Sequence, residues 1–263
     1  MSDTTGVEWT NATWNPVTGC SKVSLGCTHC YAETLSRRFG RSFEVTLHYD
    51  RIDQPLRWRK PRRIFVCSMG DLFHERVPSH FVRKVFASMA MAPQQTFQVL
   101  TKRPDRMHDW FCEDEDGYFE SRWDQGDAVA SERISVNFLC GIAAVDPMPW
   151  PLPNVWLGTS IENDRFVGRA DALRETPAAV RFVSAEPLLG PLPSLDLTGI
   201  HWLIVGGESG PGHRPMDPTW VRDLVERADA AGAAAFVKQG SGARPGRQGN
   251  LPDDLWARKE YPP

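Results

Sequence analysis

Short apolar runs recur along the chain, and most of them are followed by a turn rich in polar residues, glycine or proline. Six runs are rich in β-branched and aromatic residues: 64–68, 97–101, 155–159, 180–184, 202–206 and 234–238. Runs of this length and composition predict parallel strands that are buried on both faces of a sheet. A seventh strand is predicted near residues 6–14.

The segments between these runs carry apolar residues at helical spacing. Ser79 is the predicted N-cap of a helix whose apolar face runs from Phe81 to Met89, and Asp217 followed by Pro218 predicts another helix start. Strands that alternate with helices indicate βαβ units and a parallel sheet.

Neither GxGxxG nor GxxxxGK[ST] follows the early strands, so the usual nucleotide-binding folds are not indicated. We therefore predict an α/β fold, a partial (β/α)6-type TIM-like barrel, whose chemistry lies at the carboxyl ends of the strands. The connection after the third strand is too long for one helix. Residues 112–153 are predicted to be an insertion or flap and residues 240–263 a C-terminal tail, all within one domain spanning 1–263.

Composition narrows the class of protein. With 263 residues, 41% hydrophobic residues and a net charge of −3, the chain has the composition of a globular protein that does not depend on disulfides. We expect a cytoplasmic location and no membrane contact, because the apolar runs are short and the N-terminus is polar. In a reducing compartment, six cysteines indicate metal or redox chemistry before disulfides.

The strongest chemical motif is Cys20-x6-Cys27-x2-Cys30, in which a glycine directly precedes each of the first two cysteines. Three thiolates could hold three irons of a [4Fe–4S] cluster and leave the fourth iron open to a ligand. Zinc is the alternative metal; it needs four ligands, and His29 or His48 could complete a site with three cysteines.

Polar residues, and in one case two glycines, follow nearly every predicted strand at its carboxyl end. They are Ser68, Asp71, Lys102, Ser160, Glu162, Glu186, Gly206, Gly207, Glu208 and Lys238. Helix capping explains one such residue, but acids and bases at five consecutive strand ends are harder to explain in that way. A ring of carboxylates and lysines suits a zwitterionic cofactor, because acids hold an ammonium group and lysines hold a carboxylate.

A basic segment precedes the strand at 64–68. Its predicted nucleic-acid-binding residues are Arg57, Trp58, Arg59, Lys60, Arg62 and Arg63. One interpretation is a solvated helix end. The other is a patch whose cations contact phosphates while Trp58 stacks on a base.

Long motifs resemble those of a known family. WNPVTGCSKVSLGCTHCYAE, FVCSMGDLFHERVP and WLIVGGESGPGHRPM are similar to segments of the phage Gp37/Gp68 family, a domain of unknown function that resembles radical S-adenosylmethionine (SAM) enzymes. The resemblance runs from about Trp9 to Gly240. It implies a partial barrel in which Cys20, Cys27 and Cys30 hold a [4Fe–4S] cluster whose open iron binds SAM. Here the first cysteine interval is six residues, whereas the usual radical SAM spacing is three.

The resemblance also implies roles for the residues at the strand ends. Ser68 and Asp71 would hold the methionine ammonium group of SAM, and Ser160 and Glu162 would face its ribose or carboxylate. The remaining candidates near the adenine or the substrate are Gly206, Gly207 and Glu208, and the candidate catalytic residues are Lys102, Glu186 and Lys238.

Two functions follow as hypotheses. The first is a radical SAM-like enzyme that is reduced by an electron donor protein and modifies or repairs a nucleic acid. The second is a non-catalytic nucleic-acid-binding protein stabilised by zinc or an iron–sulfur cluster. Metal-dependent hydrolysis is weaker, because the chain has no HxH or HExxH pair.

Overall fold

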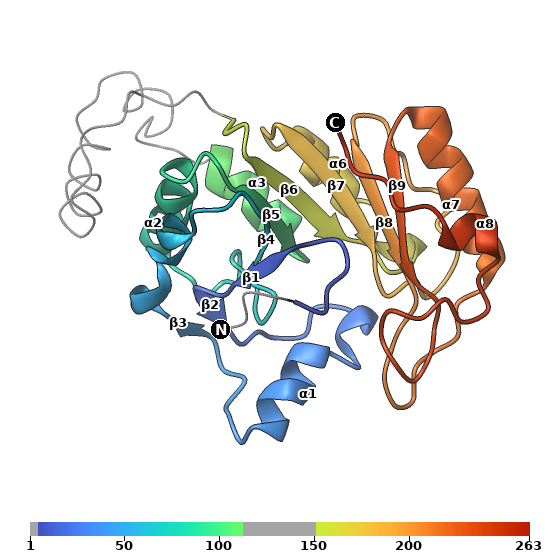
Figure 1. Cartoon of the computed structure of the whole chain (residues 1–263), viewed down its shortest axis with the longest axis horizontal. Coiled ribbons are helices and arrows are strands. Elements are labelled where there is room, and N and C mark those ends of the chain that lie inside the picture. The colour runs from blue at the N-terminus through green and yellow to red at the C-terminus, as the bar shows by residue number, and fades with distance from the viewer. Residues whose placement is uncertain (1–4, 113–150) are drawn as a thin grey trace.

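A seven-stranded parallel sheet organises the protein, as seen in a computed structural model that describes residues 5–112 and 151–263 (Figure 1). In spatial order the strands are β1 (Ala12–Trp14), β4 (Arg63–Val66), β5 (Thr96–Thr101), β6 (Val155–Ser160), β7 (Val180–Ala185), β8 (Trp202–Gly206) and β9 (Ala234–Gln239). The six predicted strands and the seventh near the N-terminus are therefore confirmed. The predicted insertion lies almost wholly outside the described residues.

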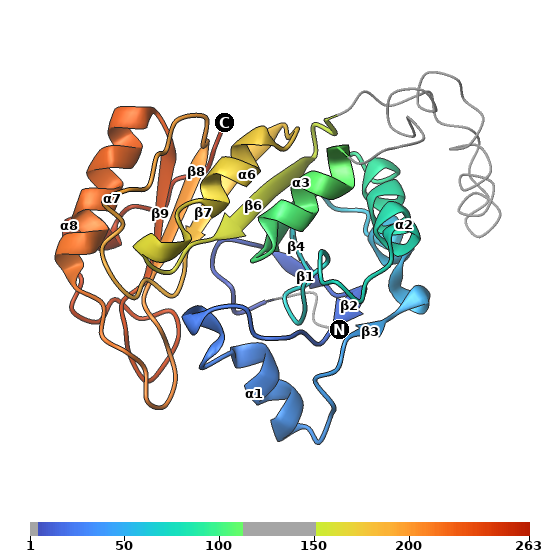
Figure 2. The same ribbon diagram turned by 180° about the vertical axis from the view of Figure 1, so that it is seen from behind.

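Each new strand of the sheet is added on the same side of the previous one. Right-handed crossovers of this kind bring the connecting helices to one face of the sheet. Figure 2 shows α3, α6 and α7 over that face. Within residues 5–112 and 151–263 the α-helices are α1 (Tyr31–Arg38), α2 (Ser79–Ala90), α3 (Pro104–Cys112), α6 (Arg169–Glu175), α7 (Pro218–Ala231) and α8 (Asp253–Trp256). A small antiparallel sheet pairs β2 (Val17–Thr18) with β3 (Thr46–Leu47).

The large sheet is curled into a half-barrel. Trp9, just before β1, contacts Trp202 of β8 with ring centroids 6.0 Å apart. Five strand spacings separate β1 from β8, so about 24 Å would separate them in a flat sheet. The contact is made across the concave side of the sheet. The predicted α/β fold is confirmed, and its seven parallel strands form a curled half-barrel.

Apolar side chains pack on both sides of the sheet. The core under the helices is on the convex side, whereas the concave floor consists of Trp9, Phe65, Phe182, Trp202, Ile204 and Phe236. Gly158 makes room for this floor, because a Cβ atom there would lie 2.5 Å from the ring of Phe182. Both faces of the strands are thus buried, as their apolar sequences predict.

Helix ends follow local chemistry, with one correction. Asp217 caps α7 by accepting a hydrogen bond from the backbone N–H of Thr219 (2.8 Å). The prediction that Ser79 caps α2 was wrong: Ser79 is the first helical residue, and Pro78 occupies the N-cap position without a side-chain hydrogen bond. In the predicted tail, Tyr261 packs against Trp202, with ring centroids 5.4 Å apart.

Candidate functional site

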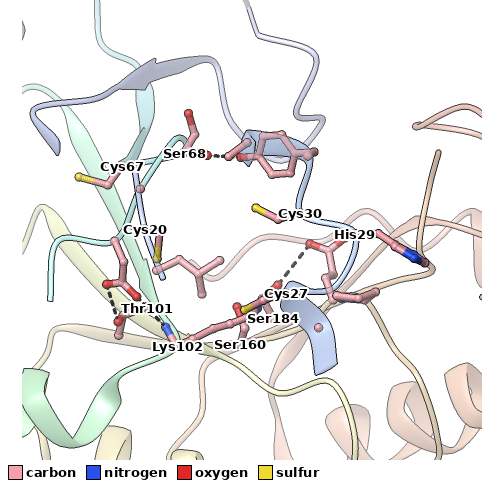
Figure 3. A pocket seen from close by; sticks show the side chains of 18 of the residues that line it. Cys20, Cys27, His29, Cys30, Cys67, Ser68, Thr101, Lys102, Ser160 and Ser184 are labelled. Atoms are coloured by element: carbon pink, nitrogen blue, oxygen red, sulfur yellow. Dashed lines mark hydrogen bonds between the residues drawn. The ribbon is translucent and has the colours of Figure 1, made fainter. Parts of the chain in front are cut away.

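A cavity of about 260 Å³ opens at the carboxyl ends of the strands, above the aromatic floor. The loop that carries the cysteines forms one of its walls. Cys20, Cys27 and Cys30 all line the cavity, and all three are free thiols of intermediate exposure. Figure 3 shows Cys20, Cys27 and Cys30 around one open space, with Lys102, Ser160 and Ser184 along its lower edge in this view.

Most of the residues predicted from the strand ends also line this cavity. They are Ser68, Asp71, Lys102, Ser160, Glu186, Gly207, Glu208 and Lys238. Glu162 and Gly206 are not among the lining residues, and neither is any residue of the basic segment 57–63. The half-barrel thus brings together side chains that lie up to 218 residues apart in sequence (Cys20 and Lys238).

An ionic contact ties the cysteine loop to the ends of β4 and β5. Asp71 accepts hydrogen bonds from the hydroxyl of Thr101 (2.8 Å) and from Nη1 of Arg103 (3.1 Å). Arg103 also donates from Nη2 to Oγ of Ser21 (2.8 Å), and its Nη1 lies 3.5 Å from Sγ of Cys20. Asp71 and Arg103 are both buried, so the pair holds the first cysteine firmly beside the cavity.

A second contact ties the loop to the end of β6. Glu162, whose side chain is fully buried, accepts a hydrogen bond from the backbone N–H of Gly26 (3.3 Å) and pairs with Arg169 (2.9 Å). A Cβ atom at Gly26 would lie 3.0 Å from the carboxyl group of Glu162, so the glycine permits this close approach. Glu162 therefore supports Cys27 from below without facing the cavity.

A third contact ties the loop to the end of β8. Glu208 contacts Nδ1 of His29 (3.0 Å) and accepts hydrogen bonds from the backbone N–H (2.8 Å) and Nε (2.9 Å) of Arg214. Arg214 in turn donates to the carbonyl of Leu25 (3.1 Å). Burial alone would raise the pKa of Glu208, but the hydrogen bonds from Arg214 and His29 outweigh it and lower the pKa to about 2.

A different pair of charges faces the open space. Nζ of Lys238 lies 3.1 Å from Oε1 of Glu186, and Oε2 of Glu186 accepts a hydrogen bond from Ser184 (3.2 Å). Gly206 is needed for this arrangement, because a Cβ atom there would lie 2.3 Å from Oε1 of Glu186. In the described part of the chain, Lys102 has no ion-pair partner.

The arrangement of the three cysteines distinguishes a site for a single metal ion from a site for a cluster. Burial, together with the charge of Asp71, raises the pKa of the Cys20 thiol to about 11, although Arg103 acts in the opposite direction. Within residues 5–112 and 151–263, no group of three His, Cys, Asp or Glu side chains is arranged so that it could hold a single metal ion. A cubane cluster makes no such demand, because each of its cysteines binds a different iron. Cys20, Cys27 and Cys30 line one cavity, and each could bind a different iron there.

The basic segment lies elsewhere. It leads into the amino end of β4, at the opposite edge of the sheet from the cavity. The guanidinium group of Arg62 covers the ring of Trp58 (5.4 Å to the centroid), and that of Arg63 covers Tyr261 (3.7 Å). Trp58 is half-buried against the core, so its ring already packs against other residues of the protein.

The predicted site residues did not include Arg103, Arg169, Arg214 and Trp9. Arg103 directly follows Lys102 at a strand end, which was a usable signal. The sequence around Trp9 carries no such signal, because an aromatic residue beside a buried strand is typical of a hydrophobic core. Its indole N–H is buried and has no hydrogen-bond partner among the residues that the structure describes.

The fold and the cavity define an α/β half-barrel protein with a cysteine-lined site at the carboxyl ends of its strands. The chain belongs to the family described as "Protein of unknown function (DUF5131)", whose model matches residues 4–250. No curated protein matches the chain, and no solved structure does. No helix in the described ranges is long and apolar enough to cross a membrane.

Proposed function

We propose that this protein is a radical SAM-type iron–sulfur enzyme with a (β/α)6-type barrel, and that it modifies or repairs a nucleic acid. One observation carries the proposal: Cys20, Cys27 and Cys30 line the same cavity as Lys102, Glu186 and Lys238, at the edge of the sheet where such barrels hold their chemistry. The resemblance of the sequence motifs to the phage Gp37/Gp68 family and to radical SAM enzymes supports the same assignment.

The chain's own residues would divide the work. A [4Fe–4S] cluster bound by the three cysteines would supply the reducing electron and the open iron at which SAM is cleaved to a radical. Asp71, with its partner Arg103, would keep the first cysteine in position. Lys102 would hold a carboxylate, and the aromatic floor beneath would exclude water from the reacting centre.

Glu186 and Lys238 would bind the polar part of the substrate. Their ion pair lies at the rim of the concave interior, with the side chain of Glu186 only 14% exposed and that of Lys238 22% exposed. A partly desolvated carboxylate and ammonium group can exchange their mutual contact for contacts with a ligand that offers both a donor and an acceptor. The electron needed for turnover would come from a donor protein.

Anaerobic reconstitution with iron and sulfide tests the proposal. We expect about four irons and four sulfides per chain, an absorbance band typical of an iron–sulfur cluster, and 5′-deoxyadenosine when SAM and a reductant are added. Replacing any of the three cysteines by serine should abolish cluster binding, whereas Cys112→Ser, at an exposed thiol on α3, should not.

The opposite results separate the alternatives. One zinc ion per chain without iron or sulfide would favour the second hypothesis, a non-catalytic nucleic-acid-binding protein with a structural metal. A cluster that survives Cys27→Ser and Cys30→Ser would show that the cysteine assignment is wrong.

A further inference from the structure

Exposed apolar side chains are concentrated beside the cysteines. Of the six large hydrophobic side chains that are exposed in the described part of the chain, five fall between residues 23 and 39. The most exposed are Leu25 (61%) and Phe39 (67%). Scattered exposed hydrophobic residues need no explanation, but a concentration of them marks a binding surface.

Helix α1 carries most of this surface. Tyr31, Leu35 and Phe39 are spaced four residues apart, so they form one stripe on the helix. The backbone N–H of Phe39 donates to the carbonyl of Leu35 (3.1 Å), which extends the stripe past the last helical residue. An amphipathic helix normally buries such a stripe. In α1 only Ala32 is buried, and Figure 1 shows α1 apart from the helices that cover the sheet.

The same segment is basic, although the whole chain carries a net charge of −3. Residues 20–43 contain one carboxylate, Glu33, which pairs with both Lys22 (3.3 Å) and Arg37 (2.6 Å). Arg38 and Arg41 are exposed and have no carboxylate partner within the described ranges. Four cations against one carboxylate give this segment a local charge of +3. The cations are Lys22, Arg37, Arg38 and Arg41.

The stripe begins at the mouth of the cavity. Tyr31 directly follows Cys30, lines the cavity, and donates a hydrogen bond from its hydroxyl to the carbonyl of Ser68. This bond holds the ring in place while 51% of the residue stays exposed. A ligand that reaches into the cavity would therefore continue over α1.

We propose that Tyr31, Leu35 and Phe39, together with Arg38 and Arg41, form the surface that binds a single-stranded nucleic acid next to the cavity. The inference rests on the substrate class of the proposed function and deepens it. Exposed rings offer stacking platforms to unpaired bases, and unpaired arginines offer contacts to phosphates. A duplex hides its base faces, so the stripe favours a single strand. This surface, and not the basic segment 57–63, adjoins the cavity.

Fluorescence anisotropy with a labelled 12-nucleotide single strand of mixed sequence, titrated at several KCl concentrations, tests this surface. We expect Phe39→Ala to weaken binding about tenfold or more, because base stacking on an aromatic ring contributes on that scale. Replacing Arg38 and Arg41 by glutamine should lower the slope of log K against log salt by about 0.7 per arginine.

Two control variants come from other exposed positions. Tyr49→Ala removes an aromatic residue that is 55% exposed but lies outside the stripe, and Arg59→Gln removes an exposed arginine of the other basic segment. Both should bind the single strand as the unaltered protein does. All the replaced side chains are exposed, and unchanged urea midpoints will show that the variants fold.

The inference is overturned if the unaltered protein does not bind the strand, or if a duplex of the same sequence binds equally well. It is also overturned if Arg59→Gln weakens binding and the α1 variants do not. A slower reduction by an acidic flavoprotein donor in Phe39→Ala, with unchanged strand binding, would assign the surface to a protein partner instead. Binding needs no SAM, so a protein that binds strands through α1 but holds no iron would overturn only the proposed function.

Discussion

Replacing only one partner of the ion pair between Glu162 and Arg169 should lower the free energy of unfolding more than most single substitutions in the protein. Glu162→Ala removes a carboxylate that is 0% exposed and leaves the Arg169 guanidinium, whose side chain is only 10% exposed, without its counter-charge. Arg169 keeps a hydrogen bond to the carbonyl of Ser160 (2.8 Å), which does not neutralise it. Removing one partner of a buried pair costs about 3–5 kcal/mol, so we expect a loss of that size in the free energy of unfolding.

Helix α6, which carries Arg169, offers a matched control. Asp171 and Arg174 form an ion pair at 2.7 Å, but their side chains are 67% and 28% exposed. Solvent screens such a pair, so Asp171→Ala should cost less than about 1 kcal/mol. Urea unfolding of both variants in the same metal state measures the two costs. The double replacement Glu162→Leu with Arg169→Met should recover most of the loss, because no charge is left unpaired.

The chemical consequence should appear at one cysteine. Without Glu162, the backbone N–H of Gly26 loses its acceptor, and the turn that leads into Cys27 is released. We expect faster reaction of Cys27 with a thiol reagent in the metal-free protein at low urea, and an unchanged rate at Cys20, which is held from the other side. If Glu162→Ala unfolds within 1 kcal/mol of the unaltered protein, or if both thiols become equally faster, the anchoring role is refuted.

Three further outcomes follow from the geometry. Gly206→Ala puts a methyl group 2.3 Å from Oε1 of Glu186, so 5′-deoxyadenosine formation should fall while iron content stays the same; loss of both together would contradict this. Gly158→Ala brings Cβ to 2.5 Å from the ring of Phe182, so urea unfolding should show a free energy of unfolding that is lower by about 1–3 kcal/mol. An unchanged free energy of unfolding would show that the aromatic floor can move to accept the methyl group. Glu208 has a pKa of about 2 against an ordinary value of 4.5, so its stabilisation is complete above pH 4.5 and is lost as the pH falls towards 2. The stability difference between the unaltered protein and Glu208→Gln should therefore shrink over that range, and a difference that grows on acidification would contradict the sign.

The strands could be predicted because they are buried on both faces. A strand such as Trp202–Gly206 has no solvent side, so its whole sequence is apolar and it ends where polar residues begin. The curl could not be predicted in the same way. It depends on how Trp9 meets Trp202 across the concave side, and nothing in a local sequence window encodes a contact between residues that are 193 positions apart.

Most of the residues predicted at the strand ends line the cavity, but their contacts could not be predicted. Parallel strands bring their carboxyl ends to one edge, so residues such as Asp71 and Glu208 had to lie near the cavity. What each carboxylate meets there depends on tertiary structure. The partner of Asp71 is Arg103, 32 residues later in the chain, and the sequence shows neither this pair nor its contact with the cysteine loop.

The choice of cation separates the three carboxylates that anchor the cysteine loop from Glu186, which is paired with Lys238 at the rim of the cavity. Asp71, Glu162 and Glu208 each pair with an arginine, whereas Glu186 pairs with a lysine. A guanidinium group is planar, offers several donors at once and is weakly hydrated, which suits a permanent buried contact. An ammonium group on a flexible chain is a hydrated point charge that can change partners. A ligand that enters the cavity can therefore separate Lys238 from Glu186. The arginine pairs that hold the cysteine loop do not depend on that contact, so the loop would keep its position.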